Sequence, residues 1–190
     1  MKTLKINSVK ILLSMVMVSF LFPACSQNSK KAGNQTLAEK PKMDIHTAVM
    51  SDNLEVVRQH IEAGTDINTK DQFSGSTPLN TAAVFGKTKI AKELIDAGAD
   101  LSIENNDGST PLHTAAFFGR VEIVQLLIDA KADKTLRNKF GATPRETVMA
   151  PFSEMKPVYE MMQQQLAPLG LQLDMAQLQK NRPVIAMMLQ

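Results

Sequence analysis

The sequence predicts an all-α solenoid of stacked helix-turn-helix repeats with short hairpin loops, closed by a helical cap at its C-terminal side. Residues 76–86 return almost unchanged at 109–119, and residues 94–100 return at 127–133, both at an offset of 33. A fixed period of this length indicates supersecondary units that bury their apolar faces against one another. Because such stacks present a surface rather than a buried catalytic pocket, the pattern favours a binding protein.

The first helix of each repeat is predicted from its ends. Thr77 can cap a helix whose first residue is Pro78, since proline has no amide to leave unpaired there. Ala82 and Ala83 are small enough for close approach to a neighbouring helix. Gly86 then ends the helix with a residue that tolerates a left-handed conformation.

The second helix of each repeat is predicted from an apolar stripe. Ile90, Ala91, Leu94 and Ile95 are spaced i, i+1, i+4 and i+5, which places them on one helical face. The following repeat has the same stripe, and Gly98 closes the helix in the first of the two.

The outer repeats differ from the central ones, as terminal repeats do when one face has no neighbour. An earlier copy begins near Ile45 at an offset of 34, so one extra residue must lie between Ile67 and Gly75. It has Asp52 where the others have glycine. A last half repeat at 141–144 meets a proline soon afterwards. We therefore assign three and a half repeats to residues 43–150 and a helical cap to residues 151–190.

This pattern of G-x-T-P-L-H-x-A-A-x-x-G, an apolar helix and L-[IL]-x-x-G-A-D resembles the ankyrin repeat over about residues 43–150. The resemblance implies a protein partner, bound through the hairpin tips and the groove-facing side of the first helices. It does not identify that partner, because specificity in this family lies in variable surface residues.

The N-terminal segment has the features of an export signal. Lys2, Lys5 and Lys10 precede an apolar run at residues 11–22, which is short for a membrane span and typical of a signal peptide over residues 1–24. Cys25, the only cysteine, follows at once, and residues 22–25 resemble the lipobox of bacterial lipoproteins. Phe22 and Pro23 depart from the usual leucine and small residue. The resemblance implies lipid attachment at Cys25; the alternative is a cleaved secretory peptide followed by a free thiol.

Residues 25–42 are then predicted to be a lipid anchor and flexible tether, because the segment after Cys25 is polar and has almost nothing apolar. In enteric bacteria, an aspartate directly after the lipidated cysteine retains a lipoprotein in the inner membrane. Residue 26 is serine, so by this analogy the protein is expected at the periplasmic face of the outer membrane. Without residues 1–24 the chain has 18 basic and 19 acidic side chains. This near-neutral balance gives no support for a nucleic-acid partner.

The tail is predicted to be helical. Ser153 and Pro157 can start one helix that runs to Gln165, and Asp174 can cap a second. Pro183 predicts a break or kink near residues 180–182. Two interpretations stay open for the tail: a cap over the last repeat, or an adaptable methionine-rich docking surface.

No catalytic or cofactor motif is present in the sequence. His46 and His113 share one repeat position, where the family's histidine bonds to loop backbone, and His60 replaces a stripe leucine on what we expect to be a partly exposed face. None has the spacing of a metal ligand. The recurring Asp66, Asp100 and Asp133 are attributed to the loops of the fold. We expect no enzyme activity, metal or cofactor.

Candidate binding residues are those that the repeat pattern does not dictate. Hairpin tips and first-helix ends carry phenylalanines and polar residues that fit a partner-binding role. Packing between repeats is the alternative for Phe85 and Phe118, whereas Phe117 and the tip phenylalanines are expected to be exposed. The candidates are Phe73, Phe85, Asn106, Phe117, Phe118 and Lys139.

The function predicted is thus a lipid-anchored cell-envelope module that binds another protein. The alternative is a protective or chaperone-like accessory, such as an immunity factor or a stabiliser of an exported enzyme. An enzyme is the third possibility, since a fold by itself does not exclude activity.

Overall fold

The structure is a computed structural model that describes residues 40–190, and within that range it contains eight α-helices, two short 3₁₀ helices and no β-strand. The predicted all-α class is confirmed. In chain order the elements are α1 (Ile45–Met50), α2 (Leu54–Glu62), α3 (Pro78–Phe85), α4 (Thr88–Asp96), α5 (Pro111–Phe117), α6 (Val121–Asp129), η1 (Glu146–Val148), α7 (Phe152–Leu166), η2 (Ala167–Leu169) and α8 (Met175–Met188).

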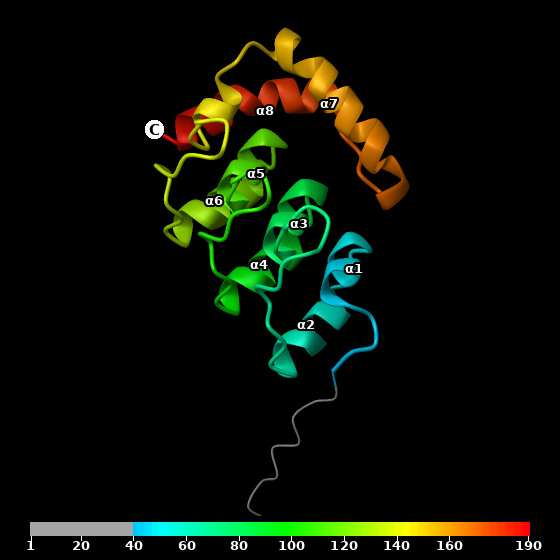
Figure 1. Ribbon diagram of the computed structural model, residues 1–190. Helices are drawn as coiled ribbons and strands as arrows, with labels where there is room; N and C mark the ends of the chain where they lie inside the picture. The colour runs from blue at the N-terminus through cyan, green and yellow to red at the C-terminus, as the bar shows by residue number, and fades with distance from the viewer. Residues whose placement is uncertain (1–39) are drawn as a thin grey trace, which may run out of the picture. The chain divides into compact units, whose positions relative to one another are not determined.

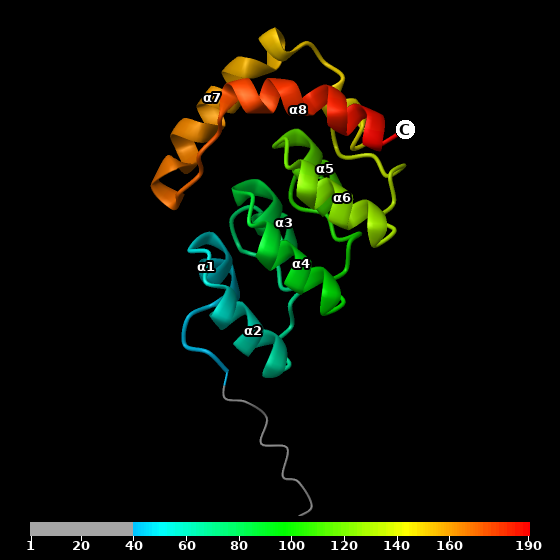
Figure 2. The same cartoon turned by 180° about the vertical axis from the view of Figure 1, so that it is seen from behind.

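The first six helices form three stacked pairs in two layers. Helices α1, α3 and α5 contact one another in sequence and make up the first layer, and α2, α4 and α6 make up the second. Figures 1 and 2 show the pairs following one another, with α7 and α8 beyond the last pair. The predicted stack of helix-turn-helix repeats, followed by a helical cap, is therefore present.

Side-chain caps start the helices of the first layer. Thr77 accepts a hydrogen bond from the Asn80 amide at 3.2 Å, and Thr110 caps α5 in the same way. The first repeat has no Thr-Pro pair, and Asp44 takes over its function by accepting from the amides of His46 and Thr47. Each cap satisfies amide groups that have no partner within the helix.

The apolar stripes meet in one continuous core. Leu94 and Leu127 of the second layer are fully buried, as are Ala83 and Ala116 of the first. The expectation for His60 is wrong: its side chain is 1% exposed. It occupies the position of the stripe leucine, and both ring nitrogens find partners, the Thr65 hydroxyl at 3.1 Å and the Met43 carbonyl at 2.8 Å. A buried histidine is tolerated because its polar atoms are satisfied.

The fourth repeat is only a turn. Thr143 and Glu146 cap each other, since the Thr143 amide donates to the Glu146 carboxylate and the Glu146 amide donates to the Thr143 hydroxyl. Only the 3₁₀ turn η1 follows. Helix α8 packs against η1, α6 and α5, and so covers the apolar side of the last complete repeat.

Gly119 allows the cap to approach the repeats closely. A Cβ atom at this position would lie 2.4 Å from Leu178 Cδ1, and its φ of 67° also favours glycine. The Asn181 side chain donates to the Gly119 carbonyl at 2.8 Å. Gly119, which closes the first helix of the last complete repeat, is therefore also a docking point for α8.

The two tail helices differ from the prediction. Helix α7 begins at Phe152, with Pro157 inside it, and α8 runs unbroken through Pro183. The predicted break at residues 180–182 is therefore wrong. Proline removes one helical hydrogen bond, here to the carbonyl of Gln179. Gln179 and Pro183 are exposed, while Leu178 and Ile185 on either side are buried, so both sides of the proline are packed against the rest of the fold and the helix continues through it.

Within residues 40–190, two residues other than glycine adopt the left-handed conformation that closes helices. Asp52 has a φ of 57° and stands where later repeats have Gly86 and Gly119. Lys131 has a φ of 66° and stands at the position of Gly98, whose φ is 83°. Lysine is strained in this region, because its Cβ approaches the backbone carbonyl.

The pair Gly98 and Lys131 provides a reciprocal test of this strain. Lys131→Gly should raise the free energy of unfolding by about 0.5–1 kcal/mol, because relief of αL strain exceeds the greater entropy of unfolded glycine. Gly98→Lys should lower it by a similar amount, since a Cβ at Gly98 meets no atom within 4 Å and steric clash adds nothing. Urea unfolding of both variants measures the difference; equal stabilities would contradict it.

Candidate protein-binding surface

Each hairpin tip is organised by one polar side chain. The Asp71 carboxylate accepts from the amides of Phe73, Ser74 and Ser76, each at 2.8 Å. Asn105 and Asn138 accept equivalent bonds in the next two tips. Burial by itself would raise the pKa of Asp71, but the bonds from the Ser74 hydroxyl and these amides outweigh it and hold the pKa below its usual value. The tips are therefore locally rigid loops.

The extra residue of the first loop lies in its tip. The Gly75 amide bonds back four residues to the Asp71 carbonyl, whereas Gly108 and Gly141 bond back three, to Asn105 and Asn138. This confirms the predicted insertion between Ile67 and Gly75. The additional residue therefore lies in the turn that carries Phe73.

Neighbouring tips are joined to one another. The Asn106 amide donates to the Ser74 carbonyl at 2.8 Å, and the Lys139 amide donates to the Asp107 carbonyl at 2.9 Å. Side chains repeat the link, from Asn106 to the Phe73 carbonyl and from Lys139 Nζ to the Asn106 carbonyl. Asn106 and Lys139 are exposed, as expected for binding candidates, but their polar groups also hold the row of tips together.

Two phenylalanines stand out of this row. Phe73 is 95% exposed and Phe140 is 78% exposed, the largest values among the exposed large apolar side chains of residues 40–190. The expected exposure of the tip phenylalanines is confirmed. Phe140 is the second of the tip phenylalanines expected to be exposed, although it was not among the candidate binding residues; its position at the third tip was the available signal.

The ends of the first helices are covered by the tail. Phe117, Phe118 and Phe85 belong to a second apolar cluster with Tyr159 of α7. The Phe117 ring lies 4.8 Å from that of Tyr159, centroid to centroid, and the Tyr159 hydroxyl donates to the Phe117 carbonyl at 3.0 Å. The expectation of an exposed Phe117 is therefore wrong, because α7 packs over it. A role of these three residues in binding stays a prediction.

The covering of Phe117 depends on residues that sequence analysis missed. Tyr159 is fully buried, and Arg182 of α8 is 3% exposed and donates to its hydroxyl at 2.5 Å. Burial raises the pKa of Tyr159, although the nearby Arg182 acts in the opposite direction. That Tyr159 is the only tyrosine of the chain was the one signal in the sequence that could have drawn attention to it. Nothing in the local sequence pattern predicts its contact with Arg182.

The shared polar position of the first helices is structural, as predicted. His46 and His113 bond through Nε2 to the carbonyls of Thr69 and Ala142, both at 3.0 Å. Asn80 occupies the same position and donates to the Ile103 carbonyl. His113 Nδ1 accepts from the Thr110 amide, which requires a neutral ring. Burial lowers the pKa of His113, consistent with that state.

The recurring loop aspartates also have structural partners. Asp100 accepts from the amide and hydroxyl of Ser102, and Asp133 accepts likewise from Thr135, which lowers the pKa of both carboxyl groups. Asp66 bonds to the Asn68 amide. Residues 40–190 hold no cluster of three or more metal-ligating side chains.

The predicted lipid-attachment residue, Cys25, and the signal peptide lie outside the residues that the structure describes. Within residues 40–190, none of the helices combines the length and the apolar character that a membrane crossing requires.

Comparison with known proteins agrees with this architecture. Residues 45–138 match the family model for ankyrin repeats, in three copies. Among solved structures, the ankyrin repeat domain of Bcl-3, a member of the IkappaB protein family, superimposes with a TM-score of 0.53 and 31% identity, over 54% of this chain and 45% of that one. The chain is an ankyrin-repeat protein.

Relatives share the repeats over part of their length. Protein phosphatase 1 regulatory subunit 27 of Mus musculus is 37% identical over 79 residues, which cover 42% of this chain and 51% of that protein. A putative ankyrin repeat protein of fowlpox virus is 44% identical over 62 residues, which cover 33% of this chain and 14% of the viral protein. The chain thus spans about half the length of the first of these relatives.

The neutral His113 predicts a pH dependence of stability. Because its pKa is lower in the folded state, the unfolded chain binds more protons, and this contribution to stability is complete above about pH 6.5 and is lost as the pH falls through the folded pKa. His113→Asn, which copies Asn80, should reduce the loss of stability between pH 7 and pH 5. The reciprocal Asn80→His should increase it. Urea unfolding across this range checks both, and unchanged slopes would contradict the assignment.

Proposed function

We propose that this chain is a protein-binding module that holds its partner on the row of hairpin tips, with Phe73 and Phe140 as its anchors. The observation that carries the proposal is the 95% exposure of Phe73 on a tip fixed by three amide bonds to Asp71. Large apolar side chains are costly to expose and are the residue type that dominates binding energy at interfaces.

The hydrogen bonds that order the tips support a role in binding for the exposed phenylalanines. The links from Asn106 to the first tip, and from Lys139 to the second, hold the row in one arrangement before any partner arrives. A preorganised surface loses less conformational entropy on association, so more of the contact energy appears as affinity. Asn106 and Lys139 then contribute mainly by positioning Phe73 and Phe140.

We further propose that the module is exported and anchored in a bacterial cell envelope through lipid on Cys25. The support is the order of three lysines, an apolar run and the only cysteine within the first 25 residues. The polar segment that follows would tether the repeats about 20–25 Å from the membrane. In the outer membrane the binding surface would face the periplasm.

A second form of the proposal makes the partner an enzyme. Relatives with 37% identity are named as regulatory subunits of a protein phosphatase, and the shared segment consists of repeats. A module of this kind could regulate, protect or stabilise an exported enzyme without chemistry of its own. Addition of the purified protein to a captured enzyme partner should then change the rate of that enzyme or its half-life on heating.

The anchor residues can be tested by site-specific photocrosslinking in the native membrane. A crosslinker at Phe73 or Phe140 should give one discrete adduct, and the double change Phe73→Ser with Phe140→Ser should weaken partner capture about tenfold or more, as loss of central anchors does. Lys89 on α4 is exposed and distant in the fold, so a crosslinker there and Lys89→Ser provide the matched controls. Equal adduct yields from Lys89, or unchanged capture by the double variant, would contradict this surface.

The anchor in the membrane can be tested separately. Cys25→Ser should move the protein from the membrane fraction to the soluble fraction, or leave an uncleaved precursor, because no thiol remains to accept lipid. Metabolic labelling with a fatty acid followed by fractionation measures this. Failure of the wild-type protein to incorporate label would exclude lipidation but would leave the tip surface untouched.

A further inference from the structure

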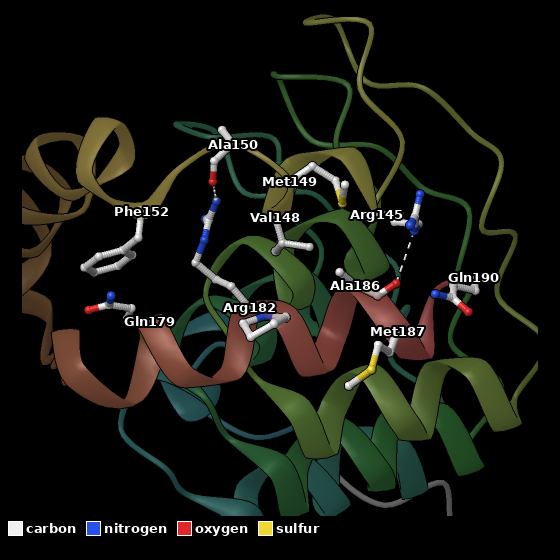
Figure 3. A pocket seen from close by; sticks show the side chains of 11 residues that line it. Arg145, Val148, Met149, Ala150, Phe152, Gln179, Arg182, Ala186, Met187 and Gln190 are labelled. Carbon is white, nitrogen blue, oxygen red and sulfur yellow. Dashed lines mark hydrogen bonds between the residues drawn. The ribbon is translucent and has the colours of Figure 1, made fainter.

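A hollow of about 390 Å³ lies at the C-terminal end of the stack, between η1 and α8. Figure 3 shows its lining: the Arg182 side chain reaches from α8 toward the Ala150 carbonyl, Arg145 lies on the side of Ala186 and Gln190, and Val148 and Met149 lie between the two arginines. The volume is within the range of small-molecule and side-chain pockets. None of the residues that line the hollow is acidic.

The two arginines are held in place but their charges are not balanced. Arg182 donates to the Ala150 carbonyl at 2.6 Å and to the Tyr159 hydroxyl, and Arg145 Nε donates to the Ala186 carbonyl at 3.1 Å. None of the ion pairs found within residues 40–190 includes either arginine. Buried charges are normally paired, so the 3% exposed Arg182 is an unusual cation.

The surroundings also favour an anion. The segments that line the hollow, residues 145–152 and 179–190, contain one acidic residue, Glu146, and it is paired with Arg137 at 2.7 Å. The main-chain oxygen of Gln190 is held by Lys134 rather than by either arginine. The same segments contain three basic residues: Arg145, Lys180 and Arg182. An anion near this end would therefore be attracted before it reaches the hollow.

The walls select among anions. Val148 and Phe152 are apolar, and the side chains of Met149 and Met187 are 54% and 62% exposed at the rim. Methionine adapts its shape to an apolar ligand. A small hydrated anion such as phosphate would leave these walls unused, whereas a carboxylate attached to an aliphatic group would meet both the cations and the walls.

We infer that this hollow is a binding site for a carboxylate carried by an apolar group, with Arg145 and Arg182 holding the carboxylate and the two methionines enclosing the apolar part. A planar guanidinium matches a carboxylate through two parallel hydrogen bonds, which makes this pairing directional. The carboxylate could belong to the end of a peptide or to an alkyl carboxylic acid. The site does not depend on the hairpin tips.

The test uses full-length protein labelled with ¹³C at the methionine methyl groups, and the signals of Met149 and Met187 are assigned from Met→Leu variants. N-acetyl-leucine and octanoate are titrated, with N-acetyl-leucine amide as the uncharged probe. We expect both acids to shift these two signals saturably, and the amide to bind about tenfold more weakly or worse. The tighter of the two acids identifies the source. No shift with either acid, or equal binding of the amide, would overturn the inference.

Substitutions distinguish binding at this site from non-specific attraction of the acids to the protein's positive charge. Arg145→Gln should weaken binding several-fold, and Met187→Glu should abolish it by placing a negative charge at the exposed rim without disturbing the core. Arg58→Gln, a charge loss on α2, provides the matched control and should bind like the wild type. An equal loss in Arg58→Gln, or full binding by Met187→Glu with an unchanged melting temperature, would overturn the assignment.

Discussion

Every helix pair in this stack has two apolar sides, and the structure depends on covering both. Central repeats cover one another through small alanines in the first layer and an aliphatic stripe in the second. The driving force for folding is the removal of apolar surface from water. A terminal repeat whose outer face stayed uncovered would therefore lose much of the free energy that stabilises it. The unusual residues of this chain are found mainly at the two ends, where no further repeat supplies that cover.

Each end solves the problem differently. At the first repeat, two polar residues stand where the other repeats have different residues. Asp44 caps the free amides of α1, and His60 replaces a stripe leucine, with both of its ring nitrogens hydrogen-bonded. At the other end, the chain abandons the repeat after η1 and places α8 against α6. Because Gly119 has no Cβ, Leu178 of α8 can approach it closely. The same residue therefore closes the end of α5 and forms part of the contact with α8.

The tail also decides which surface is left for a partner. Helix α7 covers the ends of the first helices through Tyr159, and Arg182 fastens that tyrosine from α8. The hairpin tips are bonded to one another, and Phe73 and Phe140 are exposed on them. The same arrangement leaves Arg182 without an acidic partner beside the hollow near η1. Cap formation and the proposed carboxylate site therefore share Arg182, which contacts Tyr159 and also lines the hollow.

The sequence by itself determined the repeats, their helices and the loop that is longer by one residue. These features depend on residues only a few positions apart, such as Thr77 and Pro78 or the stripe that ends at Ile95. Such spacing directly determines which residues share a helical face and where a helix begins. It also predicted the exposure of Phe73, because a tip residue has no neighbour in the repeat. The tertiary structure decided the partial burial of Phe117, the continuity of α8 through Pro183 and the role of Tyr159. Each of these results from contact between the tail and a distant repeat, where packing across tens of residues outweighs local preference, and no local pattern carries that information.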